Sequence, residues 1–162
     1  MTSMTATVSR NAIAIAQLKL ACRHVEEMMA AGVTENLAIR TLELFADVYA
    51  KMHNGGTASP HHVGDVKLWS IEAQRLRNRM PNAKPRSHFR VEHGTPRRAF
   101  ARAVLSLFQK NDLSRKTMSE LIEREYKLAV ITLKQDRHLN KVARSKRFDT
   151  PEERWAAAGI EF

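Results

Sequence analysis

The chain has 162 residues, a formal net charge of +10 and a hydrophobic fraction of 43%. This length fits one domain, or one compact domain with a docked helical extension, and the apolar content excludes a wholly disordered chain. The apolar runs are far shorter than the roughly 18 residues of a membrane span, so we expect no membrane partner. The polar residues 1–10 do not read as a signal peptide, and the single cysteine excludes an internal disulfide. We therefore expect a cytoplasmic protein of bacterial or phage type.

The positive charge is concentrated in the second part of the chain. Residues 1–60 hold five basic and five acidic residues, whereas residues 61–162 hold 22 basic and 12 acidic ones. Within residues 75–102 there are nine basic residues and a single acid, Glu92. Clustered Lys and Arg attract polyanions through charge neutralisation and counterion release. The distribution therefore favours a nucleic-acid partner over a solvated basic face without a ligand.

The N-terminal half is expected to be helical. Apolar residues recur at helical spacing in three segments: 9–31, 34–53 and 64–80. Gly32 ends the first of these helices, and Thr34 begins the second. Residues 54–62 are rich in Gly, Ser and Pro and predict a loop, and Pro81 ends the third helix.

Two short strands interrupt the helical pattern of the second half. Residues 87–93 alternate between polar and apolar types, and residues 127–132 form a second short apolar run. The helices expected around them cover 96–110, 115–126, 132–146 and 150–159. Thr132 and Thr150 each stand three residues before a Gln or Glu, which is the spacing of a capping box.

These elements predict a mainly α protein, a helical bundle with at most one small two-stranded β element in its C-terminal half. We expect residues 1–80 to form an N-terminal helical region. Residues 81–162 are expected to form a basic C-terminal region that contains the β element.

Residues 91–96, Val-Glu-His-Gly-Thr-Pro, stand where the first expected strand ends and a helix begins. The second strand and the helix 132–146 follow, and that helix carries Asp136 and Asn140 one turn apart. Over roughly residues 88–146 this order resembles the HNH, or His-Me finger, nucleases. Their signature is a strand ending in an acidic residue and His, then two residues and Pro, with a second strand and a helix later. The resemblance implies a ββα-like element and metal-dependent hydrolysis of nucleic-acid phosphodiesters.

The resemblance also implies roles for individual residues. His93 would be the general base that deprotonates water, since imidazole titrates near neutral pH. Glu92, with Asn140 or Asp136, would hold one Mg²⁺ or Mn²⁺ ion through hard oxygen ligands. Asn111, the only asparagine between the two strands, is the candidate to orient His93.

The same segment also has a purely structural interpretation. Gly94 would permit the turn, Thr95 would cap the next helix, and Glu92 would pair with Arg90 or Arg97. Two further functions therefore stay open. One is a non-catalytic nucleic-acid-binding protein, and the other is a small phage-type inhibitor or regulator that docks on a protein–nucleic-acid complex. A homodimer is a further partner arrangement that the sequence allows.

Ten cations are expected to contact nucleic-acid phosphates, because they lie in or next to the two basic clusters. They are Arg75, Arg77, Arg79, Arg86, Arg90, Arg97, Arg98, Arg102, Lys141 and Arg144.

Overall fold

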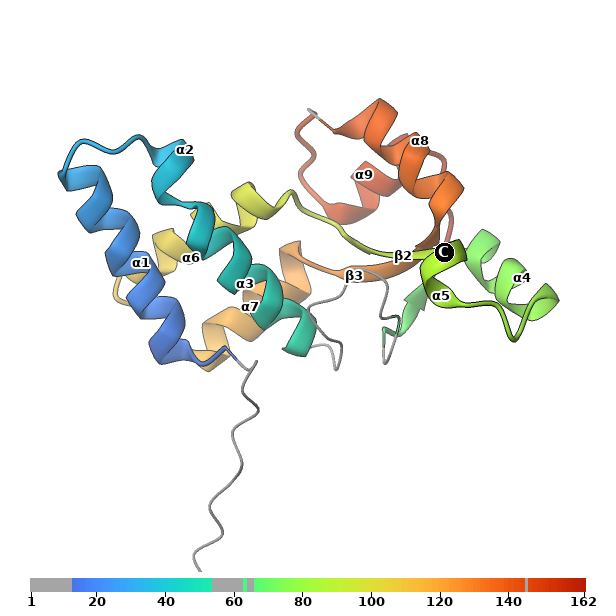
Figure 1. Ribbon diagram of the computed structural model, residues 1–162, viewed down its shortest axis with the longest axis horizontal. Coiled ribbons are helices and arrows are strands. Elements are labelled where there is room, and N and C mark those ends of the chain that lie inside the picture. Colours follow the sequence, from blue (N-terminus) through green and yellow to red (C-terminus); the bar gives the residue numbers. More distant parts are fainter. Residues whose placement is uncertain (1–12, 54–62, 64–65, 145) are drawn as a thin grey trace, which may run out of the picture.

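The computed structural model describes residues 13–53, 63, 66–144 and 146–162, so the loop expected over 54–62 lies outside the described residues. The described chain is mainly helical with one small mixed sheet (Figure 1). In chain order the elements are α1 (Ile15–Ala30), α2 (Glu35–Ala38), α3 (Arg40–His53), β1 (Leu68–Trp69), α4 (Ile71–Arg79), α5 (Pro85–His88), β2 (Phe89–His93), α6 (Arg97–Gln109), α7 (Arg115–Glu125), β3 (Leu128–Thr132), α8 (Leu133–Ala143) and α9 (Pro151–Ala157).

The helix expected over 34–53 is divided in two. Thr34 is the N-cap of α2 as expected, but α2 ends at Ala38, and α3 begins at Arg40. Ile39, at the junction, is fully buried, as is Leu42 in the first turn of α3. The break between α2 and α3 therefore coincides with apolar side chains that lie in the core.

The sheet has three strands in the order β1-β3-β2, with β1 parallel and β2 antiparallel to β3. The expectation of at most two strands is wrong, because Leu68 and Trp69 form a third strand inside the segment expected to be a helix over 64–80. The following helix, α4, begins only at Ile71, where the side chain of Ser70 accepts a hydrogen bond from the backbone N–H of Ala73.

Thr132 and Thr150 are helix N-caps, as predicted. The hydroxyl of Thr132 accepts a hydrogen bond from the backbone N–H of Gln135, whose side chain accepts one from the N–H of Thr132 in return. The hydroxyl of Thr150 accepts from the N–H of Glu153 at the start of α9, but the Glu153 side chain accepts from the N–H of Asp149, so only half of the predicted capping box forms there. These contacts fix where α8 and α9 begin.

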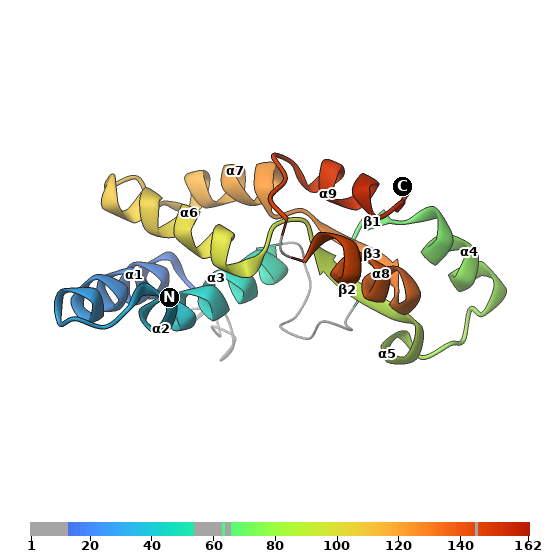
Figure 2. The same ribbon diagram turned by 90° about the horizontal axis from the view of Figure 1, so that it is seen from above.

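β3 is the centre of the protein, because its two faces belong to different hydrophobic cores. Leu128 and Val130 face the larger core, which is built mainly from the N-terminal helices with α6 and α7. Ala129 and Ile131 face a second core beneath α8 and α9, where Trp155 is 1% exposed. Figures 1 and 2 show the N-terminal helices, α6 and α7 at one end, and the sheet with α8 and α9 towards the other.

Elements from the two sides of the expected boundary near residue 80 pack against one another. β1 and α4 join the sheet, while α6 packs against α1 and α3. In the described part of the chain, no helix is both long enough and apolar enough to cross a membrane.

Candidate functional site

A cavity of about 410 Å³ lies along the outer edge of β2, the strand that ends one side of the described sheet. α3 lines one side of the cavity, and α8 and α9 supply further side chains. The N-terminal helix α3, which lies outside the nuclease-like segment, therefore contributes to the same cavity as that segment.

The four residues expected to form a nuclease centre all line this cavity: Glu92, His93, Asp136 and Asn140. Glu92 is buried, His93 and Asp136 are partly buried, and Asn140 is exposed. Asn111, expected to orient the imidazole, instead occupies the turn after α6 with a φ of 56° and does not line the cavity.

The imidazole of His93 is held in one orientation by two contacts. Its ring stacks on Tyr126 with 5.2 Å between centroids and an interplanar angle of 11°. Its Nδ1 lies 2.9 Å from the backbone oxygen of Thr95. Because a carbonyl oxygen only accepts, Nδ1 carries the proton in this contact, and Nε2 of the neutral ring keeps a free lone pair. Such a ring can act as a general base.

Glu92 has a cationic partner, and that partner is Arg154, not Arg90 or Arg97. Nη1 of Arg154 donates to Oε1 of Glu92, and it lies 3.3 Å from the backbone oxygen of His93. Arg154 is 6% exposed and Glu92 is 7% exposed. This buried ion pair therefore connects α9 to the end of β2.

Two buried N–H donors at this cavity have no hydrogen-bond partner among the described residues. They are Nε of Arg154 and Nε of Arg90. Arg90 does approach Asp136, but its Nε lies 3.6 Å from Oδ2, which is an ion pair beyond hydrogen-bond length. Buried donors are nearly always paired in folded proteins, so these two Nε–H groups are unsatisfied within the part of the chain that the structure describes.

Asp47, on α3, gathers three donors around one buried carboxylate. Oδ2 lies 2.8 Å from Nζ of Lys51 and 3.3 Å from Arg97, and Oδ1 accepts a 2.6 Å hydrogen bond from the hydroxyl of Tyr126. Burial alone would raise the pKa of Asp47. The hydrogen bonds from Lys51 and Tyr126, with the charges of Lys51 and Arg97, outweigh it and hold that pKa below its ordinary value.

Sequence reasoning missed Asp47, Lys51, Tyr126 and Arg154. Asp47 stands between apolar residues on a helix, and Arg154 directly precedes a buried tryptophan. A charged residue within an apolar pattern was the available signal. The partners could not be identified from it, because they lie 62 and 79 positions away in the chain.

The carboxylates at the cavity do not form a ready site for a divalent ion. Glu92 is engaged by Arg154, Asp136 by Arg90, and Asp47 by Lys51 and Arg97. No group of three or more His, Cys, Asp or Glu in the described ranges is placed to hold a metal. Mg²⁺ needs direct oxygen ligands at about 2 Å, and an ion bound to Glu92 or Asp136 would lie beside the guanidinium that already pairs with that carboxylate. The donor set therefore does not fit the implied Mg²⁺ or Mn²⁺ ion.

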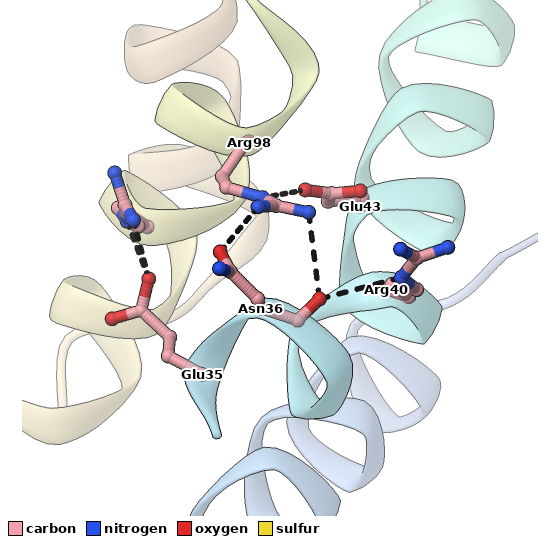
Figure 3. A network of polar contacts seen from close by, with 6 residues as sticks. Glu35, Asn36, Arg40, Glu43 and Arg98 are labelled. Atoms are coloured by element: carbon pink, nitrogen blue, oxygen red, sulfur yellow. Dashed lines mark hydrogen bonds and ion pairs between the residues drawn. The ribbon is translucent and has the colours of Figure 1, made fainter.

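Two of the arginines expected to contact phosphate form ion pairs with residues of α2 and α3. Nε of Arg98 donates a 2.5 Å hydrogen bond to Oε1 of Glu43, and Nη1 of Arg98 donates one of the same length to Oδ1 of Asn36. Figure 3 shows the three side chains facing one another. Arg102 donates to Glu35 at 2.7 Å. These contacts join α6 to α2 and α3, so both arginines have a structural role.

The other expected phosphate contacts lie on open surface or at the cavities. Arg75 and Arg79 line a second cavity of about 590 Å³, together with Lys134. Arg77 places its guanidinium 4.7 Å from the ring centre of Trp69, a cation–π contact. Arg90 and Arg97 line the first cavity. The remaining three are exposed: Arg86, Lys141 and Arg144.

No protein-family model matches the chain, and neither a curated protein nor a solved structure shows significant similarity to it.

Proposed function

We propose that this protein binds a nucleic-acid strand with one phosphodiester in the cavity beside β2, and hydrolyses it with His93 as the general base. The observation that carries the proposal is the composition of one cavity. An oriented imidazole lies there together with three arginines, two of which have Nε–H donors that make no hydrogen bond to another described residue.

The charges around the cavity suit a phosphate. Four cations line it, Lys51, Arg90, Arg97 and Arg154, against three carboxylates that are already paired. Guanidinium groups bind phosphate oxygens through charge-assisted, often two-pronged hydrogen bonds. The volume of about 410 Å³ lies within the range of small-molecule sites.

The chemistry needs few groups. Nε2 of His93 takes a proton from water, the water oxygen forms a bond to phosphorus, and the bond from phosphorus to the leaving oxygen breaks. The leaving oxygen takes its proton from solvent. The arginines stabilise the negative charge that builds up on the phosphate oxygens.

The order of elements supports this reading. Glu92 and His93 end β2, β3 pairs antiparallel with β2, and α8 then carries Asp136 and Asn140 to the same cavity. This is the order that the nuclease resemblance implies. Two departures are α6 and α7, which lie between the strands, and the pairing of Glu92 with Arg154.

The test is cleavage of labelled single-stranded DNA, duplex DNA and RNA by the full chain, with Mg²⁺, with Mn²⁺ or with chelator. We expect His93→Ala to lose cleavage but keep binding. His138→Ala is the matched control, because His138 is exposed on α8 and does not line the cavity. Absence of cleavage of all three substrates under every condition would refute hydrolysis.

A second candidate is nucleic-acid binding without catalysis, which the second cavity favours. Arg75, Arg79 and Lys134 line it, and none of them forms an ion pair with another described residue. We expect the affinity for DNA to fall steeply with salt. Arg75→Gln should reduce the slope of that fall, whereas Arg102→Gln, which removes a cation already paired with Glu35, should change it less. Equal slopes for both variants would argue against this surface.

A further inference from the structure

The carboxylate that the sequence assigns to a metal ion has a protein cation as its partner. Nη1 of Arg154 donates to Oε1 of Glu92 in an environment where each residue is less than one-tenth exposed. A guanidinium keeps its charge throughout the pH range in which proteins stay folded. Glu92 is therefore neutralised by a cation that belongs to the fold.

The docking of α9 holds Arg154 in this position. Thr150 caps the helix, and Pro151 lies directly against Gly94, the residue that follows β2. Trp155, the next residue after Arg154, is 1% exposed in the second core. Contacts on both sides of Arg154 thus fix the backbone that carries it.

Arg154 has a further N–H donor that makes no hydrogen bond to another described residue. Nε of Arg154 is buried and has no hydrogen-bond partner among the described residues, and the same is true of Nε of Arg90. Both residues line the cavity, as does Arg97, whose side chain is 45% exposed. A ligand that accepts several hydrogen bonds would satisfy these donors once the side chains that cover the two Nε atoms shift to admit it, whereas a metal cation would satisfy none of them.

We propose that Arg154 takes the place of the divalent ion at this site, and that the cavity binds a phosphodiester directly through Arg154, Arg90 and Arg97. Phosphate oxygens match the planar fork of a guanidinium, and the paired carboxylates leave a net positive charge for the anion. Nucleic acid as the source of the phosphodiester rests on the function proposed above. Phosphate binding without a metal ion does not depend on it.

The experiment follows the arginine Nε–H signals of the full chain by NMR. Inorganic phosphate and a short single-stranded oligonucleotide are each titrated in the presence of chelator, and Mg²⁺ alone is titrated separately. We expect both phosphate compounds to shift the Nε–H signals of Arg154 and Arg90, and Mg²⁺ alone to leave them unchanged. Phosphate binding that requires Mg²⁺, or a shift of these signals by Mg²⁺ alone, would overturn the proposal.

Variants separate the arginine fork from simple charge. Arg154→Lys keeps the charge but removes the fork, and we expect the affinity for phosphate to fall by about tenfold, as for one lost charge-assisted hydrogen bond. Because Arg154 is buried, Arg97→Gln serves as a second variant on a half-exposed side chain and should also weaken binding. Arg137→Gln, at an exposed position of α8 outside the cavity, should leave the affinity unchanged. Equal affinities for the Arg97 and Arg137 variants and the unaltered protein would refute the proposed contacts.

The outcomes for the two proposals differ. If phosphate binds in chelator but no nucleic acid is cleaved, the inference stands and hydrolysis fails. If cleavage occurs only with Mg²⁺ and phosphate does not bind without it, hydrolysis stands and the inference fails.

Discussion

The hydroxyl of Tyr126 donates a 2.6 Å hydrogen bond to Oδ1 of Asp47, 79 positions earlier in the chain. The ring of Tyr126 also stacks on His93 and, at 4.1 Å between centroids, on Phe100. An N-terminal helix therefore fixes the aromatic ring against which the proposed base lies. The helix α3 is in this way part of the site.

We expect Asp47→Ala to destabilise the protein by about 3–5 kcal/mol, since it leaves the buried Lys51 without its carboxylate. Glu43→Ala is the matched control. Glu43 lies one turn earlier on α3 and pairs with the next arginine of α6, but in a more exposed place. Its loss should cost only about 1 kcal/mol or less. Urea unfolding measures both variants, and equal losses would contradict the central role of Asp47.

Acid should also destabilise the protein through Asp47. Its pKa in the folded protein is lower than the ordinary 3.8, so the folded state holds this proton less tightly than the unfolded state does. The stabilisation from the charged carboxylate is complete above about pH 4 and is lost as the pH falls through the lower, folded-state pKa. Urea unfolding at a series of acidic pH values should show this loss. Asp47→Asn, which cannot titrate, should show a shallower fall over the same range.

The two tyrosines should titrate in a fixed order. Burial raises the pKa of Tyr126 well above 10, and the adjacent Asp47 raises it further, whereas burial raises the pKa of Tyr49 less and Arg115 opposes the rise. Ultraviolet absorbance should therefore show Tyr49 ionising first. Because the folded-state pKa of Tyr126 is raised, its contribution to stability is complete below pH 10 and is lost as the pH rises beyond it. Tyr126→Phe should remove the later step, and loss of the earlier step instead would reverse the assignment.

Local chemistry accounts for what the sequence predicted correctly. The capping box at Thr132 and the N-cap at Thr150 involve residues three positions apart, so their spacing alone identifies the starts of α8 and α9. The alternation over 87–93 likewise predicted β2, because an edge strand with one face on the core shows period two, although residues 87 and 88 belong to α5 and the strand begins at Phe89. The strand β3 was predicted from the short apolar run over residues 127–132.

Long-range pairing accounts for the rest. β1 has only two residues, and they are extended because they pair with Ala129 and Val130, some 60 positions later. Nothing in the local pattern distinguishes Leu68 from the first turn of a helix. The partner of Glu92 was mispredicted for the same reason: Arg90 and Arg97 are near in sequence, but the docking of α9 brings Arg154 to it.

Cys22 should be unreactive in the folded protein. It is fully buried on α1, and burial, with a smaller contribution from Glu26, raises the pKa of its thiol to about 12. The thiolate is the nucleophile, so a thiol reagent should modify Cys22 only when the protein unfolds. The modification rate in mildly alkaline buffer should rise with urea along the unfolding curve. Rapid modification of the native protein would show that α1 opens separately.

Gly94 should not tolerate a side chain, although its backbone conformation does not require glycine. A Cβ there would lie 2.6 Å from Cγ and 3.1 Å from Cα of Pro151 at the start of α9. We expect Gly94→Ala to cost about 1–3 kcal/mol, the range for overpacked sites. Denaturant unfolding measures this cost, and Ala99, on the exposed face of α6, provides the control substitution Ala99→Ser.

A double-mutant cycle tests whether the clash itself is the cause. Pro151→Gly removes the two side-chain atoms that the new methyl group would meet most closely, so the double variant should lose less stability than the sum of the single changes. Since α9 carries Arg154, displacing it should also separate the Glu92–Arg154 pair and weaken phosphate binding in Gly94→Ala. Additive losses, or unchanged phosphate binding in a destabilised Gly94→Ala protein, would show that the position of Arg154 does not depend on this contact.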